Sequence, residues 1–437
     1  MSDREDRAGS DSESEDETLA NDLVVTKYNM AADIVNAILK ELIAEVKEGV
    51  EVGALCDSGD KKLAERTAKI FKKEKNVKKG SAFPTCISVN HCICHYSPLR
   101  SETAITLKNG DVVKIDLGAH IDGYIATAAH TVVVGASKDQ KVTGRKADAI
   151  HAAYNAMEAA IRMLRPGQHK NMEVTDTIQR FADIYQVKPV ENMLSHQIKR
   201  NKIDGEKQII QAPGEKQRSE MEKCEFDKYE VYAIDVLMST GDGKGRDLDT
   251  RTTVYKKSDD LVYSLKMKAS RTFLSEAVNK FGSMPFTLRS WEEEKTAKLG
   301  VIECERHGLM KPYQVLYERD NEIVAQFKST VLVMPNGLLK ITGLPLDTEV
   351  YSTEHKVDDE KLSQLLASSL KPSKKKTKKA TDESEKKDGA PAEKKDATPA
   401  KKDDAAAKDA KNAKSPAAAA NGTDKNAKSA KPAKTKA

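Results

Sequence analysis

The sequence of 437 residues lacks the features of a membrane-spanning or disulfide-stapled protein. No apolar run reaches the roughly 18–20 residues that a transmembrane helix needs, and the acidic N-terminus contains no apolar signal segment. The six cysteines form no paired Cys-x-x-Cys knuckles, so a structural zinc site is not indicated: Cys56, Cys86, Cys92, Cys94, Cys224 and Cys304. These absences predict a soluble protein of a reducing compartment that does not insert into membranes.

Charge is concentrated at the two ends of the chain. Residues 1–20 carry eight acids and two arginines, whereas residues 371–437 carry 20 lysines and ten acids. The last 67 residues contain no Val, Ile, Leu, Met, Phe, Trp, Tyr or Cys. Such a segment cannot bury enough apolar surface to offset the entropy of ordering it. We therefore expect disordered charged tails at 1–20 and 371–437 around a nearly neutral folded part.

The folded part shows helix-like and strand-like patterns in an order that occurs twice. Apolar spacing predicts helices, Asp122-Gly123 is a good hairpin turn, and a helical insertion interrupts the second half at 261–310. The order predicts an α+β fold of two related halves over 21–350, followed by a short helical region at 351–370. The expected helices begin near Thr26 and span 58–76, 150–164 and 174–184, and the expected strands span 86–95, 111–135, 190–199, 229–238 and 313–335.

Four ionisable residues stand inside apolar, strand-like sequence. They are His95, Asp116, His196 and Asp235. A carboxylate buried in a strand is costly unless it is paired, hydrogen-bonded or bound to a metal. Each of these residues alone is more often structural than a ligand, and their spacing does not bring them together.

Several motifs, taken in order, resemble the pita-bread fold of the type II methionine aminopeptidases over about residues 21–350. Within that superfamily the chain is most similar to the proliferation-associated, ErbB-receptor-binding proteins, which share the Asp-Leu-Gly strand, a lysine-rich second helix and a basic C-terminal extension. The motifs are Ala82-Phe83-Pro84-Thr85, His95-Tyr96, Lys114 to His120, Tyr232 to Asp235 and Gln326-Phe327.

The resemblance also implies where the enzymes' metal ligands would lie. Those enzymes hold two divalent metals with two Asp, one His and two Glu. Here the matching positions hold, in order, Asp116, Thr127, His196, Asp235 and Lys328. His95 resembles the substrate-positioning histidine of the enzymes and becomes a relic or a structural residue.

This replaced set predicts that the metals are lost. An ammonium about 4 Å from a divalent ion is repelled by roughly 8 kcal/mol at an effective dielectric constant near 20. A two-metal mechanism needs both ions to activate water and to clamp the substrate carbonyl. We therefore expect no metal, no cofactor and no catalytic residue, and we expect Lys328 to pair with Asp116 or Asp235 in the space where a metal would lie.

Other surfaces must then carry the function. One is the basic stretch from 61 to 79, where nine cations accompany two acids; another is the basic start of the C-terminal tail. Both suit phosphate contacts, nuclear import or simply solvation. Two candidate partner-docking elements are Trp291 in the insertion and the LxxLL pattern of Leu362, Leu365 and Leu366. The basic residues are Lys61, Lys62, Arg66, Lys69, Lys72, Lys73, Lys75, Lys78, Lys79, Lys374, Lys375, Lys376, Lys378 and Lys379.

The resemblance implies a non-catalytic, RNA- and ribosome-associated protein that contacts the large ribosomal subunit. It also implies roles in ribosome biogenesis, translation and growth regulation, residence in the cytoplasm and the nucleus or nucleolus, and possible signalling or transcription partners. One alternative is a protein–protein adaptor or transcriptional co-regulator without direct RNA binding. The other is a residual metallo-aminopeptidase with a metal on Asp116, His196 and Asp235.

Overall fold

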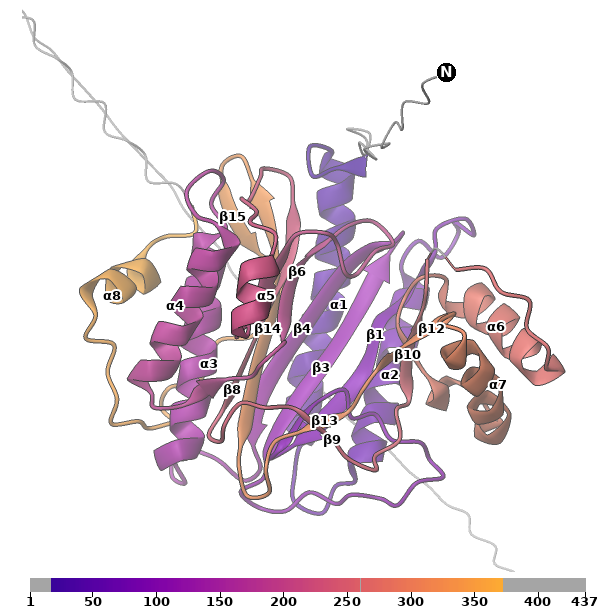
Figure 1. Ribbon diagram of the computed structural model, residues 1–437, viewed down its shortest axis with the longest axis horizontal. Coiled ribbons are helices and arrows are strands. Elements are labelled where there is room, and N and C mark those ends of the chain that lie inside the picture. Colours follow the sequence, from indigo (N-terminus) through magenta and orange to yellow (C-terminus); the bar gives the residue numbers. More distant parts are fainter. Residues whose placement is uncertain (1–16, 260, 372–437) are drawn as a thin grey trace, which may run out of the picture. The chain divides into compact units, whose positions relative to one another are not determined.

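The computed structural model describes residues 17–259 and 261–371 (Figure 1). Most of the two charged tails expected at 1–20 and 371–437 therefore lies outside the described residues, as do Lys374 to Lys379. The first helix, α1 (Asp22–Glu45), begins a few residues before the expected start at Thr26. Asn21 causes the earlier start, because its side chain caps the helix by accepting a hydrogen bond from the backbone N–H of Leu23.

The second helix, α2 (Val52–Lys69), differs from the expected span of 58–76. It begins earlier because Val52, Leu55 and Leu63 form one buried stripe along the helix. It ends at Lys69, because Phe71 takes a positive φ of 44° that a continuing helix cannot adopt, while Ile70 and Phe71 still pack partly buried on the same core. The lysines from 72 to 78 therefore lie in a connecting segment, before the strand β1 (Lys79–Val89).

A nine-stranded antiparallel sheet forms the centre of the molecule, with the strand order β1-β3-β4-β14-β8-β6-β7. The hairpin predicted at Asp122-Gly123 is confirmed, since both residues take positive φ angles of 56° and 82° between β3 and β4. In addition, β5 pairs with β8, and β15 pairs with β14. The bounds are β3 (Val112–Ile121), β4 (Tyr124–Val133), β5 (Lys188–Pro189), β6 (Leu194–Ile198), β7 (Gln208–Ile210), β8 (Val231–Ser239), β14 (Val324–Met334) and β15 (Gly337–Lys340).

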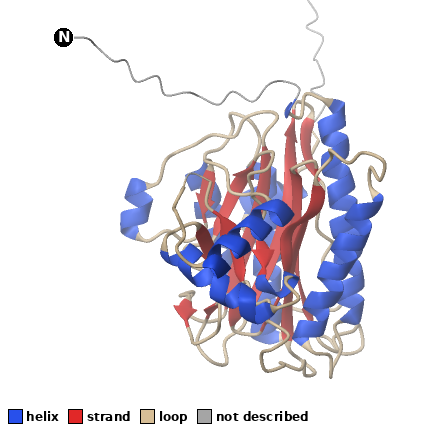
Figure 2. Ribbon diagram, turned by 90° about the vertical axis from the view of Figure 1, so that its right-hand side faces the viewer, coloured by secondary structure: helices blue, strands red, loops and turns tan. Residues whose placement is uncertain are grey.

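Two apolar cores divide this sheet into the two predicted halves. One core packs α1 and α2 against β1, β3 and β4, and the other packs α3 (Gly144–Met163) and α4 (Asn171–Ile184) against β8 and β14. Seen from the side in Figure 2, long helices run along one face of the strands. The pita-bread α+β fold expected from the sequence is therefore the one observed.

The insertion has a core of its own at the edge of the first half. The helices α6 (Lys268–Phe281) and α7 (Glu294–Arg306) pack on a three-stranded sheet of β11 (Phe286–Thr287), β10 (Val254–Lys257) and β12 (Met310–Tyr313). A 3-10 turn, η2 (Leu288–Ser290), precedes Trp291. Trp291 is half-buried against Phe273 and Phe286, and its indole N–H donates to Glu276. Its first role is thus to hold the insertion together.

The remaining elements are short. A second three-stranded sheet joins β2 (Cys92–Cys94), β13 (Leu316–Tyr317) and β9 (Arg246–Asp247), and a small helix α5 (Glu215–Glu220) precedes β8. The six cysteines are free, and five of them are buried. In the described ranges, no helix combines the length and the apolar character needed to cross a membrane.

The last helix, α8 (Glu360–Ala367), carries the LxxLL pattern. Leu362 is buried in the core of the second half, and Leu365 and Leu366 pack partly buried against the same core. These leucines are therefore used within the protein's own fold. Docking into a partner's groove would require α8 to leave this position.

Candidate functional site

The strand register gathers the expected relic residues on one face of the central sheet. Asp116 of β3 lies opposite Ala129 of β4, and Ala129 also pairs with Lys328 of β14. Lys328 in turn lies opposite Asp235 of β8. Directly opposed residues of an antiparallel pair point to the same face, so these three charged side chains converge although they are far apart in sequence.

Thr127 and His196 join the same face by the two-residue repeat of a strand. Thr127 stands two residues before Ala129, and His196 of β6 pairs with Ala233, two residues before Asp235. Thr127 is buried, and its backbone N–H donates to the hydroxyl of Thr330 at 2.9 Å. The positions that the resemblance singled out thus do form one buried centre.

Lys328 is paired with both aspartates of this centre. Its Nζ lies 2.6 Å from Oδ2 of Asp116 and 3.0 Å from Oδ2 of Asp235. The amide of Gln326 also donates to both carboxylate oxygens of Asp235, at 2.9 and 3.1 Å. The prediction that the lysine pairs with one of the aspartates is confirmed, and the lysine in fact bridges the two.

The pKa values of this pair follow from burial and charge. Burial raises the pKa of Asp116 to about 6, and the attraction of the Lys328 ammonium limits that rise. Burial alone would lower the pKa of Lys328, but the two carboxylates outweigh it and raise that pKa above its ordinary value. The proton therefore stays on the lysine at neutral pH, and the centre holds one cation between two anions.

An aromatic cluster covers the centre. The rings of Phe83, His95 and Tyr313 contact one another with centroids 5.2–5.9 Å apart, and Nζ of Lys328 lies 5.3 Å from the ring centroid of Phe83. Burial lowers the pKa of His95 to about 4, and its Nδ1 lies 3.0 Å from the carbonyl oxygen of Gln314. The histidine is thus neutral and donates from Nδ1 to the main chain.

These residues do not fit a pair of divalent metals. In the part of the chain that the structure describes, no three His, Cys, Asp or Glu side chains are grouped so that they could hold a metal ion. The ammonium of Lys328 stands between the two carboxylates that would be ligands, where it would repel a dication by several kcal/mol. One oxygen, Oδ1 of Asp116, is buried without a hydrogen-bond partner, but a single oxygen is not a ligand set.

The basic stretch from 61 to 79 separates into two groups. Three of its nine cations bond to the protein itself: Lys62 pairs with Glu45, Arg66 pairs with Glu41, and Lys79 donates to backbone carbonyls, including that of Phe71 at 3.0 Å. The other six are exposed and have no carboxylate partner among the described residues. These six surface lysines are Lys61, Lys69, Lys72, Lys73, Lys75 and Lys78.

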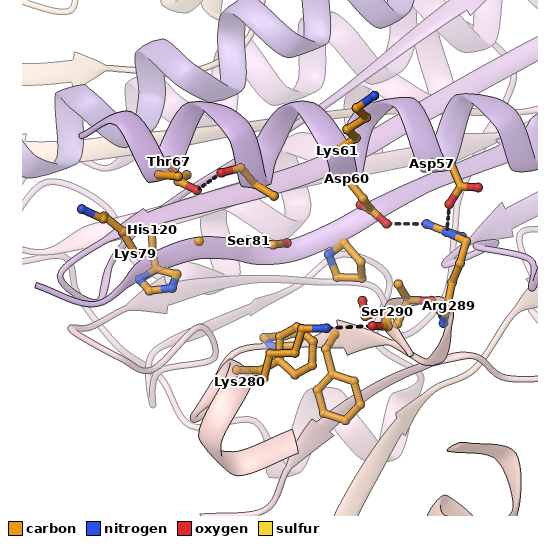
Figure 3. Close-up of a pocket in the computed structure, with 18 of the residues that line it drawn as sticks. Asp57, Asp60, Lys61, Thr67, Lys79, Ser81, His120, Lys280, Arg289 and Ser290 are labelled. Atoms are coloured by element: carbon orange, nitrogen blue, oxygen red, sulfur yellow. Dashed lines mark hydrogen bonds and ion pairs between the residues drawn. The ribbon is translucent and has the colours of Figure 1, made fainter. Parts of the chain in front are cut away.

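A groove beside these lysines was not found from the sequence. It lies between α2 with β1 on one side and the insertion on the other, and encloses a cavity of about 800 Å³ (Figure 3). Lys280 and Arg289 of the insertion line one wall, and Lys61 and Lys79 belong to the other. Sequence patterns could not show this, because the two walls are about 200 residues apart in the chain.

Comparison with known proteins identifies the family. Residues 26–243 match the model of metallopeptidase family M24. Proliferation-associated protein A of Dictyostelium discoideum is 46% identical over 84% of this chain and 94% of its own length. The chain belongs to the proliferation-associated, ErbB-3-binding protein family. ErbB-3 binding protein 1 of Arabidopsis thaliana is 45% identical over 82% of this chain and 89% of its own length. A curved DNA-binding protein of Schizosaccharomyces pombe is 40% identical over 85% of this chain and 97% of its own length.

A solved structure supports the same assignment of fold. The structure of a thermophilic Arx1 superimposes with a TM-score of 0.76 and 31% identity, and covers 80% of this chain and all of that one. The family and the fold expected from the sequence are thus confirmed.

Proposed function

We propose that this member of the family is a non-catalytic protein that binds RNA and the large ribosomal subunit. It would act in ribosome biogenesis, translation and growth regulation, in the nucleolus and the cytoplasm. The family resemblance is the reason for proposing the ribosome as the partner. The surface charge is the reason for proposing direct binding to nucleic acid.

The loss of catalysis is supported by the buried centre. The bridging of Asp116 and Asp235 by Lys328 leaves the enzymes' ligand positions occupied by an internal ion pair. Thr127 offers a neutral hydroxyl where an anionic ligand is needed. Such a centre has no means of activating water with two metals.

RNA binding rests on one observation: the six surface lysines have no acidic partner of their own. Lysines that neutralise phosphates release condensed counterions, which gives strong but sequence-independent affinity. The S. pombe relative, named for binding curved DNA, supports a nucleic-acid partner for this family. Absence of an aromatic RNP-type motif in the sequence argues for phosphate contacts and against base readout.

Co-sedimentation with purified large ribosomal subunits over a salt series tests the proposal. The full chain would be compared with a variant in which the six surface lysines are changed to Gln, and with Lys361→Glu on α8 as the control. Binding that weakens with salt and with the six changes, but not with the control, is expected. If the full chain fails to bind even at low salt, the ribosomal proposal is wrong.

Equilibrium dialysis against Mn²⁺ and Co²⁺ tests the non-catalytic part. The expected result is no stoichiometric metal and no release of methionine from a methionyl peptide. Two bound ions per chain would contradict it. One bound ion that is lost in Asp116→Asn would instead favour a residual metallo-aminopeptidase.

A protein–protein adaptor is the second candidate, and the insertion favours it. Six large apolar side chains of the insertion are at least one third exposed: Leu261, Val262, Met267, Val278, Leu299 and Ile302. The Arabidopsis relative is named for binding ErbB-3, which is itself a protein. If Leu299→Asp with Ile302→Asp abolishes binding to large ribosomal subunits while the six-lysine variant still binds them, the adaptor replaces the RNA-binding proposal.

A further inference from the structure

The groove between α2 and the insertion continues toward the N-terminus of the described chain. A second cavity, of about 610 Å³, shares Lys79, His120, Lys280 and Phe281 with the first and adds Lys78 and Arg200. We call the two cavities together the basic groove. Figure 3 shows the first of the two cavities, with α2 on one wall and Lys280 and Arg289 on the other.

The acids that line the basic groove are already neutralised. Asp57 pairs with Arg100 and Arg289, and Asp60 pairs with Arg289. The third acid, Asp122, pairs with Lys27 and Arg200. The lining arginines are thus held by the lining acids.

The lysines that line the basic groove are not neutralised in this way. Among the described residues, Lys61, Lys78, Lys79 and Lys280 have no carboxylate partner, and Lys280 donates only to the carbonyl oxygen of Ser290 at 2.7 Å. These lysines have no anion of their own, so an occupant with negative charge would be stabilised beside them, although the Lys61 side chain points away from the cavity in Figure 3.

Two neutral hydrogen-bond donors line the same groove without a described partner. The ring of His120 is buried, and its Nδ1 accepts from the backbone N–H of Gly123 at 3.3 Å, which leaves the proton on Nε2. Burial lowers the pKa of His120 to about 4, so the ring stays neutral. The hydroxyl of Ser81 is buried and unpaired. Both donors suit carboxylate or carbonyl oxygens.

The described chain begins at the mouth of this groove. Glu17 forms an ion pair with Arg200, one of the lining residues. The 16 residues that precede it carry seven acids and two arginines, with Ser10, Ser12 and Ser14 among the acids. Fully extended, they could reach roughly 55 Å, whereas the stretch of α2 from Lys61 to Ala68 in the groove is only about 10 Å long.

We propose that the acidic segment 1–16 docks in the basic groove of its own chain and competes there with phosphate-bearing ligands. The Glu17–Arg200 pair places the segment at the groove entrance, so docking is intramolecular and has a high effective concentration. Lys61 and Lys78 belong both to the groove and to the six surface lysines. The regulatory part of the inference therefore rests on the proposed RNA binding, whereas the docking itself does not.

Lysine acetylation followed by mass spectrometry tests the docking without any RNA. Lys61, Lys78 and Lys280 are exposed reporters, and Lys361 on α8 is the reference lysine. The full chain would be compared with a chain that begins at Glu17, with a full-length chain whose seven acids in 1–16 are changed to amides, and with a chain that ends at Lys371. Each would be measured at low salt and at about 1 M salt, where the Debye length is about 3 Å.

If the segment docks, deleting residues 1–16 and neutralising their seven acids should each raise the acetylation rates of the three reporter lysines about fivefold at low salt. A factor of this size is expected for a segment that is docked most of the time. The rate at Lys361 should not change, and the differences should vanish at high salt. Unchanged reporter rates would overturn the docking. A rise caused equally by removing residues 372–437 would also overturn it, because the C-terminal tail would then be needed to cover the groove.

Binding to a single-stranded RNA, measured with the same chains, separates the two proposals. If the chain beginning at Glu17 gains both reporter reactivity and about fivefold RNA affinity, docking and competition both hold. If reporter reactivity rises but no form binds RNA, the docking stands and the proposed function fails. If RNA binds equally well to every form and reactivity is unchanged, the proposed function stands and this inference fails.

Discussion

Lysines are used in opposite ways in two regions of this molecule. In the buried centre, Lys328 lies within 3.0 Å of two carboxylates and is fully neutralised by them. Along α2 and the segment after it, six surface lysines have no acidic partner in the described structure. A buried ammonium loses its hydration and is stabilised when carboxylates of the fold pair with it, whereas an exposed ammonium stays hydrated and can be left for a partner. The difference indicates that the buried lysine stabilises the fold, and it agrees with the proposal that the surface lysines contact a partner.

A second buried lysine sharpens the comparison. Lys114 is 1% exposed, on the same sheet face as Asp116, but its Nζ bonds only to the carbonyl oxygen of Asn90. Burial lowers the pKa of Lys114 to about 8, while the two carboxylates raise the pKa of Lys328. Both lysines are buried, so the carboxylate partners of Lys328 account for the difference between the two pKa values.

The largest effect is expected from Lys328→Met. It would leave Asp116 and Asp235 buried without a cation, and we expect a loss of about 3–5 kcal/mol in the free energy of unfolding. Urea denaturation at pH 7 measures this. The triple variant with Asp116→Asn and Asp235→Asn should recover most of the loss. A loss below about 1 kcal/mol for Lys328→Met alone would mean that the ion pair is not what stabilises the centre.

Acid should destabilise the fold through its buried neutral histidines, and His130→Phe should remove part of that effect. Burial, aided by Lys340, lowers the pKa of His130 to about 4. Between pH 4 and 6.5 the unfolded chain binds a proton there that the native chain does not, so stability falls as pH falls through this window. The lost contribution is about 3 kcal/mol per histidine at pH 4.

The measurement is the free energy of unfolding at pH 7 and pH 4.5. We expect His130→Phe to keep the edge-on ring contact with Phe327 at pH 7 and to lose less stability on acidification than the unchanged chain. Asp116 acts in the other direction, since its raised pKa makes stability fall as pH rises from 3.8 to about 6. An identical acid dependence in both chains would rule out His130 as a contributor.

Lys114→Met should have the opposite sign from Lys328→Met. Removing a buried ammonium that has no anionic partner relieves a desolvation cost, and we expect a gain of about 1 kcal/mol at pH 7. The gain should shrink as pH rises from 8 to 10.5, because the native lysine then loses its proton first. A loss comparable to that of Lys328→Met would show that burial alone governs both sites.

The smallest effect on stability is expected from the surface. Changing the six surface lysines to Gln should alter the free energy of unfolding by less than about 0.5 kcal/mol each, because none has an ion pair to lose. Thermal unfolding at fixed ionic strength checks this. A large loss of stability would show that these lysines support the fold instead of a partner.

The sequence could predict the centre better than its surroundings. Lys328 and Asp116 could be placed together because the family register fixes which strand positions face each other, and the Asp122-Gly123 turn is a local signal. The end of α2 was predicted wrongly, because lysines are good helix formers and no local pattern marks the positive φ of Phe71 that ends the helix. The position of Lys280 across the groove depends on how the insertion docks, which no local pattern contains.

The salt dependence of RNA binding tests the central claim most directly. Six phosphate contacts to a single strand give a slope of log K against log salt of roughly −4, from about 0.7 per contact. With a single-stranded RNA, the unchanged chain should show at least this slope, and the variant with the six surface lysines changed to Gln should lose about that much of it. An unchanged slope in the variant would contradict the account, because the uncompensated lysines would then not be the binding surface.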